Sequence, residues 1–205
     1  MVNEAKKVAV IGAGNVGATC AFVLAERKIG KIVLLDIFEG FAKGKALDMS
    51  QGGQILNYDG TITGTSDYKD IADSDVVVVT SGFPRKPGMS REDLVEKNAE
   101  IISQVGKGIK EFAPNSVIVM VTNPLDLMTY HMQKITGFSA ERVVGQAGIL
   151  DSARMTHFVA DELGVSNEDV QAMVLGGHGD TMVPLPRYTT VSGIPITQLI
   201  SNARI

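Results

Sequence analysis

Short apolar runs alternate along the chain with longer segments in which apolar residues recur every three or four positions. The runs are rich in β-branched side chains, as expected of strands that are buried on both faces of a parallel sheet. They cover residues 8–11, 32–35, 76–79 and 117–121. The periodic segments predict helices over residues 16–26, 41–49, 91–112 and 125–135. Strand and helix in alternation predict an α/β fold with a doubly wound parallel sheet of the Rossmann type.

The pattern changes after about Gly148. Residues 150–163 predict a helix that stops at Gly164, and residues 170–175 and 182–188 predict two strands. A further helix is expected to begin near Ile196. We therefore expect a Rossmann domain over residues 1–148, followed over 149–205 by the first, incomplete part of an α+β substrate domain.

Composition and charge exclude some classes of protein. The formal net charge is −4, and no run of Lys and Arg exceeds two residues, which argues against a nucleic-acid-binding protein. No apolar run is long enough to span a membrane, and the N-terminal residues lack the apolar segment of a signal peptide. The single cysteine, Cys20, cannot form an intrachain disulfide and is expected to be a buried, unreactive thiol. These features favour a cytoplasmic protein without a membrane or nucleic-acid partner.

A glycine-rich motif joins the first predicted strand to the first predicted helix. It has the form G-x-G-x-x-G and consists of Gly12, Ala13, Gly14, Asn15, Val16 and Gly17. In that setting the glycines permit a tight turn and close approach of a pyrophosphate to the helix N-terminus. Asp36, at the end of the next strand, is placed to accept hydrogen bonds from an adenosine ribose. Because no cation follows Asp36 to bind a 2′-phosphate, NAD is favoured over NADP; the alternative is an ordinary glycine turn with a helix-capping aspartate.

Several polar residues could carry the chemistry of hydride transfer to a 2-hydroxy acid, which needs a base and cations for the substrate. His178, between two glycines, is the candidate base, although a lone histidine is more often structural. Asp151 and Arg154 share one face of a predicted helix and form either an ordinary ion pair or an orienting carboxylate and a carboxylate-binding guanidinium.

Two further segments follow predicted strands, at the edge where ligands bind in such sheets. The loop after residues 76–79 contains Arg85 and Arg91, which are either solvated charges or a mobile source of positive charge for an anionic substrate. Asn123 is held out of helical geometry by Pro124 and could cap a helix, hydrogen-bond a substrate oxygen, or do both.

Taken together and in order, these motifs resemble the lactate/malate dehydrogenase family across almost the whole chain. The segments that carry the resemblance are Gly12–Gly17, Asp36, Gly82–Arg91, Val121–Pro124, Gly148–Arg154 and Gly176–Asp180. The resemblance implies that His178 is the proton donor and acceptor, paired with Asp151, and that Arg154 binds the substrate C1 carboxylate. It also implies that Arg91 and Asn123 bind the substrate carbonyl oxygen. The implied NAD contacts are Gly12, Ala13, Gly14, Asn15, Val16, Gly17, Asp36, Asn98, Val121, Thr122 and Asn123.

The resemblance carries further expectations. Members with glutamine at the position of Arg85 typically act on lactate, whereas those with arginine act on malate, and an unpaired guanidinium in a closed site would disfavour pyruvate. The expected substrates are therefore malate and oxaloacetate. A cis Asn123–Pro124 bond and a homodimer or homotetramer are also implied. Family members continue beyond the position of Ile205, so an NAD-binding but catalytically incomplete piece, or a dehydrogenase of another 2-hydroxy acid such as lactate, remain alternatives.

Overall fold

The computed structural model describes residues 6–59, 62–84, 88 and 90–201, except for the side chain of Arg91. The chain forms two compact units, Met1–Gly145 and Gln146–Ile205. The functional division expected after residue 148, between a cofactor domain and the start of a substrate domain, stays a prediction.

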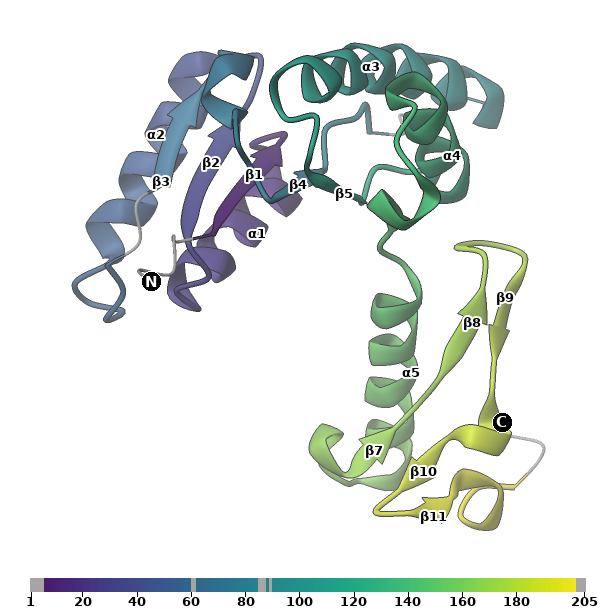
Figure 1. Ribbon diagram of the computed structural model, residues 1–205. Coiled ribbons are helices and arrows are strands. Elements are labelled where there is room, and N and C mark those ends of the chain that lie inside the picture. Colours follow the sequence, from purple (N-terminus) through teal and green to yellow (C-terminus); the bar gives the residue numbers. More distant parts are fainter. Residues whose placement is uncertain (1–5, 60–61, 85–87, 89, 202–205) are drawn as a thin grey trace. The chain divides into compact units, whose positions relative to one another are not determined.

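The first unit is built on a six-stranded parallel sheet with the strand order β3-β2-β1-β4-β5-β6. The strands are β1 (Lys7–Ile11), β2 (Lys31–Leu35), β3 (Ile62–Thr65), β4 (Val76–Val79), β5 (Val117–Met120) and β6 (Val143–Gly145). Four helices connect them: α1 (Asn15–Glu26), α2 (Glu39–Gly52), α3 (Arg91–Phe112) and α4 (Leu125–Thr136). The expected Rossmann architecture is confirmed (Figure 1).

The order of the strands explains where the helices lie. The chain runs outward from β1 to β3, returns to the middle of the sheet at β4 and then runs outward in the other direction. Because parallel crossovers are right-handed, α1 and α2 cover one face and α3 and α4 cover the other, as Figure 1 shows. The central strands are therefore buried on both faces: Ala9, Val10, Leu34 and Ile118 are each 0% exposed. This reversal leaves the carboxyl ends of β1 and β4 side by side at the crevice where such sheets bind ligands.

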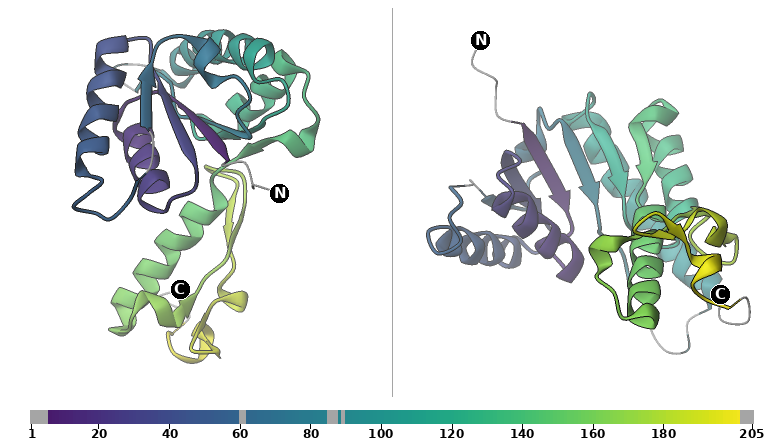
Figure 2. Two further views of the ribbon diagram at one scale, coloured as in Figure 1. Left: turned by 60° about the vertical axis from the view of Figure 1, so that its left-hand side comes forward. Right: turned by 90° about the horizontal axis from the view of Figure 1, so that it is seen from below.

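The second unit packs short antiparallel strands beside helix α5 (Gly148–Leu163), as Figures 1 and 2 show. Strands β8 (Val174–Gly176) and β9 (Met182–Pro184) form a two-stranded ribbon. A separate sheet contains β7 (Val170–Gln171), β10 (Thr190–Val191) and β11 (Ile194–Pro195). The core of this unit consists of Val159, Ala160, Val170, Val191 and Ile196.

Three expectations for the second unit were wrong in detail. Residues 170–175 do not form one strand, because β7 pairs with β10 whereas β8 pairs with β9. Residues 182–188 are a strand only as far as Pro184, after which Pro186 begins a 3₁₀ turn, since prolines lack the N–H that a sheet ladder requires. At Ile196 the structure has a short 3₁₀ turn rather than the first turn of a longer helix, as far as the described residues extend.

In the described part of the chain, no helix combines the length and the apolar character needed to cross a membrane. Cys20 is partly buried in the first unit, and desolvation raises the pKa of its thiol. A thiol with a raised pKa is poorly nucleophilic at neutral pH, in line with the unreactive cysteine expected from the sequence.

Candidate functional site

The glycine-rich turn between β1 and α1 is closely packed at two of its glycines and open at the third. Gly12 has a φ of +102°, and a Cβ placed on it would lie 2.7 Å from the backbone nitrogen of Ser81. A Cβ on Gly17 would overlap the carbonyl oxygen of Gly12 and lie 2.6 Å from Thr80 Oγ1. A Cβ on Gly14 would meet no described protein atom within 4 Å. Packing therefore requires glycine at positions 12 and 17, whereas Gly14 leaves space in front of the turn.

Helix α1 directs its N-terminus at this space. Gly14 is the N-cap, no side chain among the described residues caps it, and the first turn contains no acidic residue. The uncapped N–H groups and the positive end of the helix dipole suit a bound anion. The turn therefore fits the pyrophosphate of a dinucleotide.

Asp36 ties the glycine turn to the end of β2. Its Oδ2 accepts a hydrogen bond from the Ala13 N–H at 2.7 Å, and its Oδ1 accepts one from the Phe38 N–H at 3.0 Å. Each carboxylate oxygen has a second lone pair that can accept a ribose hydroxyl. The sequence predicted a ribose contact or, as the alternative, a helix-capping aspartate; it did not predict the hydrogen bond to Ala13, which no motif spacing signals.

The two close-packed positions in the turn allow a direct prediction. We expect Gly17→Ala to destabilise the protein by about 3 kcal/mol, because the new methyl group must displace the backbone of Gly12. Gly14→Ala is the matched control: its methyl group enters open space, so stability should fall by at most about 1 kcal/mol while NADH binding weakens. Urea unfolding and NADH fluorescence titration measure the two effects. Equal destabilisation of the two variants would contradict this account of the turn.

The loops that follow β4 and β5 meet beside helix α3. Thr122, 5% exposed, donates its hydroxyl proton to the carbonyl oxygen of Ser81 at 2.7 Å. Asn98 of α3 is 2% exposed and contacts both loops. Asn123 is exposed, and the bond between it and Pro124 is cis, as predicted. Val121, which the resemblance assigned to NAD, is half-buried and donates its N–H to the Val79 carbonyl at 2.9 Å.

Of the two loop arginines, the structure describes only the backbone of Arg91. Arg85 lies outside the described residues, and Arg91 is the first residue of α3, with its side chain also outside them. The helix begins there because Ser90 caps it: Ser90 Oγ accepts the Asp93 N–H at 3.0 Å, and the Asp93 carboxylate accepts the Ser90 N–H at 3.1 Å. The hydrogen bonds from Ser90 lower the pKa of Asp93, so the capping box stays intact at neutral pH.

In the second unit, Asp151 joins the candidate base to the candidate anion-binding arginine. Its Oδ2 lies 2.8 Å from His178 Nδ1, and its Oδ1 lies 3.2 Å from a terminal nitrogen of Arg154. The Asp151 side chain is 3% exposed, that of His178 is 19% exposed and that of Arg154 is 58% exposed. Helix α5 supplies Asp151 and Arg154 one turn apart, and the segment after β8 brings His178 back to the same carboxylate.

Asp151 therefore makes the ion pair with Arg154 that the i,i+3 spacing allows and also contacts the histidine. A buried carboxylate accepts the proton of Nδ1–H, so the neutral imidazole carries its lone pair on Nε2. The same negative charge stabilises the imidazolium that forms when Nε2 takes up a proton. Arg154, largely exposed, has further N–H groups that can grip a ligand carboxylate in two-pronged fashion.

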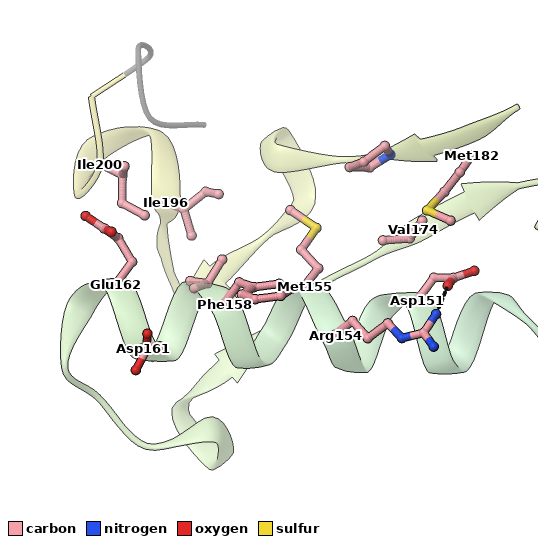
Figure 3. A pocket seen from close by; sticks show the side chains of 12 residues that line it. Asp151, Arg154, Met155, Phe158, Asp161, Glu162, Val174, Met182, Ile196 and Ile200 are labelled. Carbon is pink, nitrogen blue, oxygen red and sulfur yellow. Dashed lines mark hydrogen bonds and ion pairs between the residues drawn. The ribbon is translucent and has the colours of Figure 1, made fainter. Parts of the chain in front are cut away.

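A cavity of about 590 Å³ lies along the same face of α5 (Figure 3). Apolar side chains form most of it: Met155, Phe158, Val159, Val174, Met182, Pro184, Ile196 and Ile200. Its charged lining comprises Arg154 near Asp151 and, farther along the helix, Asp161 and Glu162. With one cation among three carboxylates, the cavity as a whole does not suit a doubly anionic ligand, and only its Arg154 end could bind a carboxylate.

The other histidines have different surroundings. His131 Nε2 lies 2.8 Å from Ser103 Oγ and 3.2 Å from the Ala99 carbonyl, and so links α4 to α3. His157 is exposed on α5 beside the ring of Phe158. Among the described residues, no group of three or more His, Cys, Asp or Glu side chains is arranged to hold a metal ion.

Both units of the chain match the models of a known protein family. Residues 6–145 match the model of the NAD-binding domain of lactate/malate dehydrogenases. Residues 149–204 match the model of their α/β C-terminal domain. A malate dehydrogenase of Methanosarcina barkeri is 56% identical over 199 residues, which cover 97% of this chain and 65% of that protein. One of Rhodopirellula baltica is 56% identical over 201 residues, covering 97% and 64%.

Solved structures of malate and lactate dehydrogenases also resemble this chain. The apo malate dehydrogenase of Picrophilus torridus is 50% identical, with a TM-score of 0.92 over 98% of this chain and 64% of that one. A Cryptosporidium parvum lactate dehydrogenase, complexed with lactic acid and NAD, is 40% identical, with a TM-score of 0.92 over 100% of this chain and 64% of that one. The chain thus spans 64–65% of the length of these four relatives.

Proposed function

Because the chain belongs to the lactate/malate dehydrogenase family, we propose that the whole protein is an NAD-dependent dehydrogenase that interconverts malate and oxaloacetate. The observation that carries the proposal is the buried Asp151 carboxylate, which contacts both His178 Nδ1 and Arg154. A proton-transferring imidazole beside a carboxylate-binding guanidinium is what oxidation of a 2-hydroxy acid requires.

The residues of the first unit fit NAD as the cofactor. Open space at Gly14, the uncapped N-terminus of α1 and the half-buried Asp36 match a pyrophosphate and a ribose in that order. Asp36 disfavours a 2′-phosphate, and so NADP, by charge repulsion. When bound, the reduced cofactor supplies the hydride that adds to C2 of oxaloacetate. Ala13, Asn15, Val16, Val121 and Thr122 are proposed as further contacts.

The proton moves through His178. In oxaloacetate reduction, the imidazolium donates its Nε2 proton to the C2 carbonyl oxygen, which becomes the hydroxyl of malate as the hydride arrives at carbon. In malate oxidation, Nε2 accepts the hydroxyl proton. Asp151 keeps the ring oriented in both directions, because its carboxylate is held against Nδ1.

Three guanidinium groups and one amide are proposed to hold the substrate. We propose that Arg154 binds the C1 carboxylate, that Arg91 and Asn123 bind the C2 oxygen, and that Arg85 binds the second carboxylate. The support for Arg154 is its place beside Asp151 with a largely exposed guanidinium. The support for the other three is their sequence positions after β4 and β5.

The direct test is NADH oxidation by the purified protein with oxaloacetate or pyruvate as acceptor, and with NADPH in place of NADH. We expect turnover with NADH and oxaloacetate, and far less with pyruvate or NADPH. Equal or faster turnover of pyruvate would overturn the assignment of substrate. NADH binding without turnover of any 2-oxo acid would instead support a cofactor-binding piece, the alternative that rests on the 64–65% coverage of its relatives.

The oligomeric state and the cellular location of the protein are also proposals. We propose that the protein self-associates as a homodimer or homotetramer, in keeping with its family and with the exposed apolar side chains Phe41 and Leu47 on α2. Light scattering with size-exclusion chromatography distinguishes the two and would contradict the proposal by giving a monomer. A cytoplasmic location is proposed from the use of a single, unpaired cysteine.

A further inference from the structure

The side-chain amide of Asn98 links two loops that lie at the carboxyl edge of the sheet. Its Oδ1 accepts the Phe83 N–H at 2.6 Å, and its Nδ2 donates to the Asn123 carbonyl oxygen at 2.7 Å. Nδ2 also lies 3.5 Å from the Phe83 carbonyl oxygen. With 2% of its surface exposed, Asn98 uses both donor hydrogens and an acceptor lone pair on backbone groups of the protein itself.

The surroundings of Asn98 leave little room for either loop to shift. A Cβ on Gly82 would lie 2.6 Å from Thr122 Cγ2 and 3.4 Å from Asn98 Oδ1, so the loops are in close contact at this point. The Thr122 hydroxyl makes a second link, to the Ser81 carbonyl at 2.7 Å. Helix α3 carries Asn98, and the helix is itself fixed at its start by the Ser90 cap.

We propose that Asn98 is a positioning residue for the substrate site, which holds the backbones of Phe83 and Asn123 at a fixed separation. The proposal rests on the proposed function, because the role of Asn123 at the substrate C2 oxygen gives this separation its importance. Asn98 therefore acts on substrate through other residues rather than through a contact of its own.

An amide is required at this position because it presents a donor and an acceptor from one short, planar group. Leucine has a similar shape but neither function, and would remove the hydrogen bonds that the Phe83 N–H and the Asn123 carbonyl make with Asn98. Aspartate keeps the acceptor for Phe83. Only its protonated form can donate to Asn123, and its ionised form places a negative oxygen against the carbonyl.

The first experiment does not depend on catalysis. Amide hydrogen exchange is measured at Phe83 in the parent and in Asn98→Leu, with the Thr80 and Val121 amides, which donate to Ile11 and Val79, as internal references. We expect at least about tenfold faster exchange at Phe83 in the variant and unchanged exchange at the references. Unchanged protection at Phe83 would overturn the proposal, whether or not the parent turns over substrate.

The second experiment separates positioning from cofactor contact. We expect Asn98→Leu to lower kcat/KM for oxaloacetate by about 10- to 100-fold, with a smaller change in the dissociation constant for NADH. In Asn98→Asp, activity relative to the parent should rise about tenfold or more between about pH 8 and pH 5.5, as the buried carboxyl becomes protonated. Gln104→Glu adds the same charge at an exposed position of α3 and should follow the parent at each pH.

The two experiments distinguish failure of the Asn98 proposal from failure of the proposed function. A constant activity ratio of Asn98→Asp to the parent across the pH range, or a loss confined to NADH affinity in Asn98→Leu, would overturn the proposal. A parent without oxaloacetate turnover would count against the proposed function alone, and the exchange at Phe83 would still decide whether Asn98 fixes the loop.

Discussion

Replacement of His178 by glutamine is expected to lower kcat for oxaloacetate reduction by about 10²- to 10⁴-fold, with NADH affinity unchanged. Glutamine keeps much of the side-chain volume but cannot carry a proton to the substrate at neutral pH. The loss should appear in kcat rather than in cofactor binding, because His178 belongs to the second unit and the glycine turn to the first. Steady-state kinetics and an NADH titration measure the two quantities.

The matched control is His157→Gln. His157 is exposed on α5, the same helix that carries Asp151, and makes no hydrogen bond to Asp151 or Arg154. It should keep the parental kcat. Asp151→Asn should also be slow, because an amide cannot stabilise the imidazolium by charge. A normal kcat in His178→Gln, or an equal loss in His157→Gln, would rule out His178 as the proton carrier.

Much of this fold could be predicted because buried parallel strands have a simple pattern. The run Val76–Val79 is continuously apolar and is a strand with those bounds. By contrast, β3 has a single large apolar residue, Ile62, and β6 is only three residues long, so neither gives a run that stands out from a loop. Both lie at the edges of the sheet, where less of each strand is enclosed.

The second unit was harder to predict because its strands are two or three residues long. No periodicity can be measured over Val170–Gln171, and the division between β7 and β8 is decided by which distant strand each one pairs with. The sequence offered the pairing of His178 with Asp151 only as one alternative, and the family resemblance selected it, since the two residues are 27 positions apart and no spacing rule connects them. Asn98 shows a similar limit: its backbone contacts are tertiary, and its sequence neighbourhood is that of an ordinary amphipathic helix.

The second large effect is expected at Arg85, which determines the choice of substrate. Replacing Arg85 with glutamine should lower the ratio of kcat/KM for oxaloacetate to that for pyruvate by about 10²- to 10⁴-fold. With arginine, pyruvate leaves the guanidinium charge without a partner in a water-poor site, whereas the second carboxylate of oxaloacetate neutralises it. With glutamine, that penalty on pyruvate disappears together with the attraction for oxaloacetate. Initial rates with each acceptor at saturating NADH give the ratio.

Lys86→Gln separates this pairing from a general attraction between the loop and anions. It removes the same charge one residue further along the same loop. A paired Arg85 makes the substrate preference sensitive to position 85 and nearly insensitive to position 86, at low and at high salt alike, because a close ion pair is poorly screened. If the preference fell equally in both variants and disappeared in high salt, the loop would act only by long-range attraction, and the choice of malate over lactate would have to be made by another part of the protein.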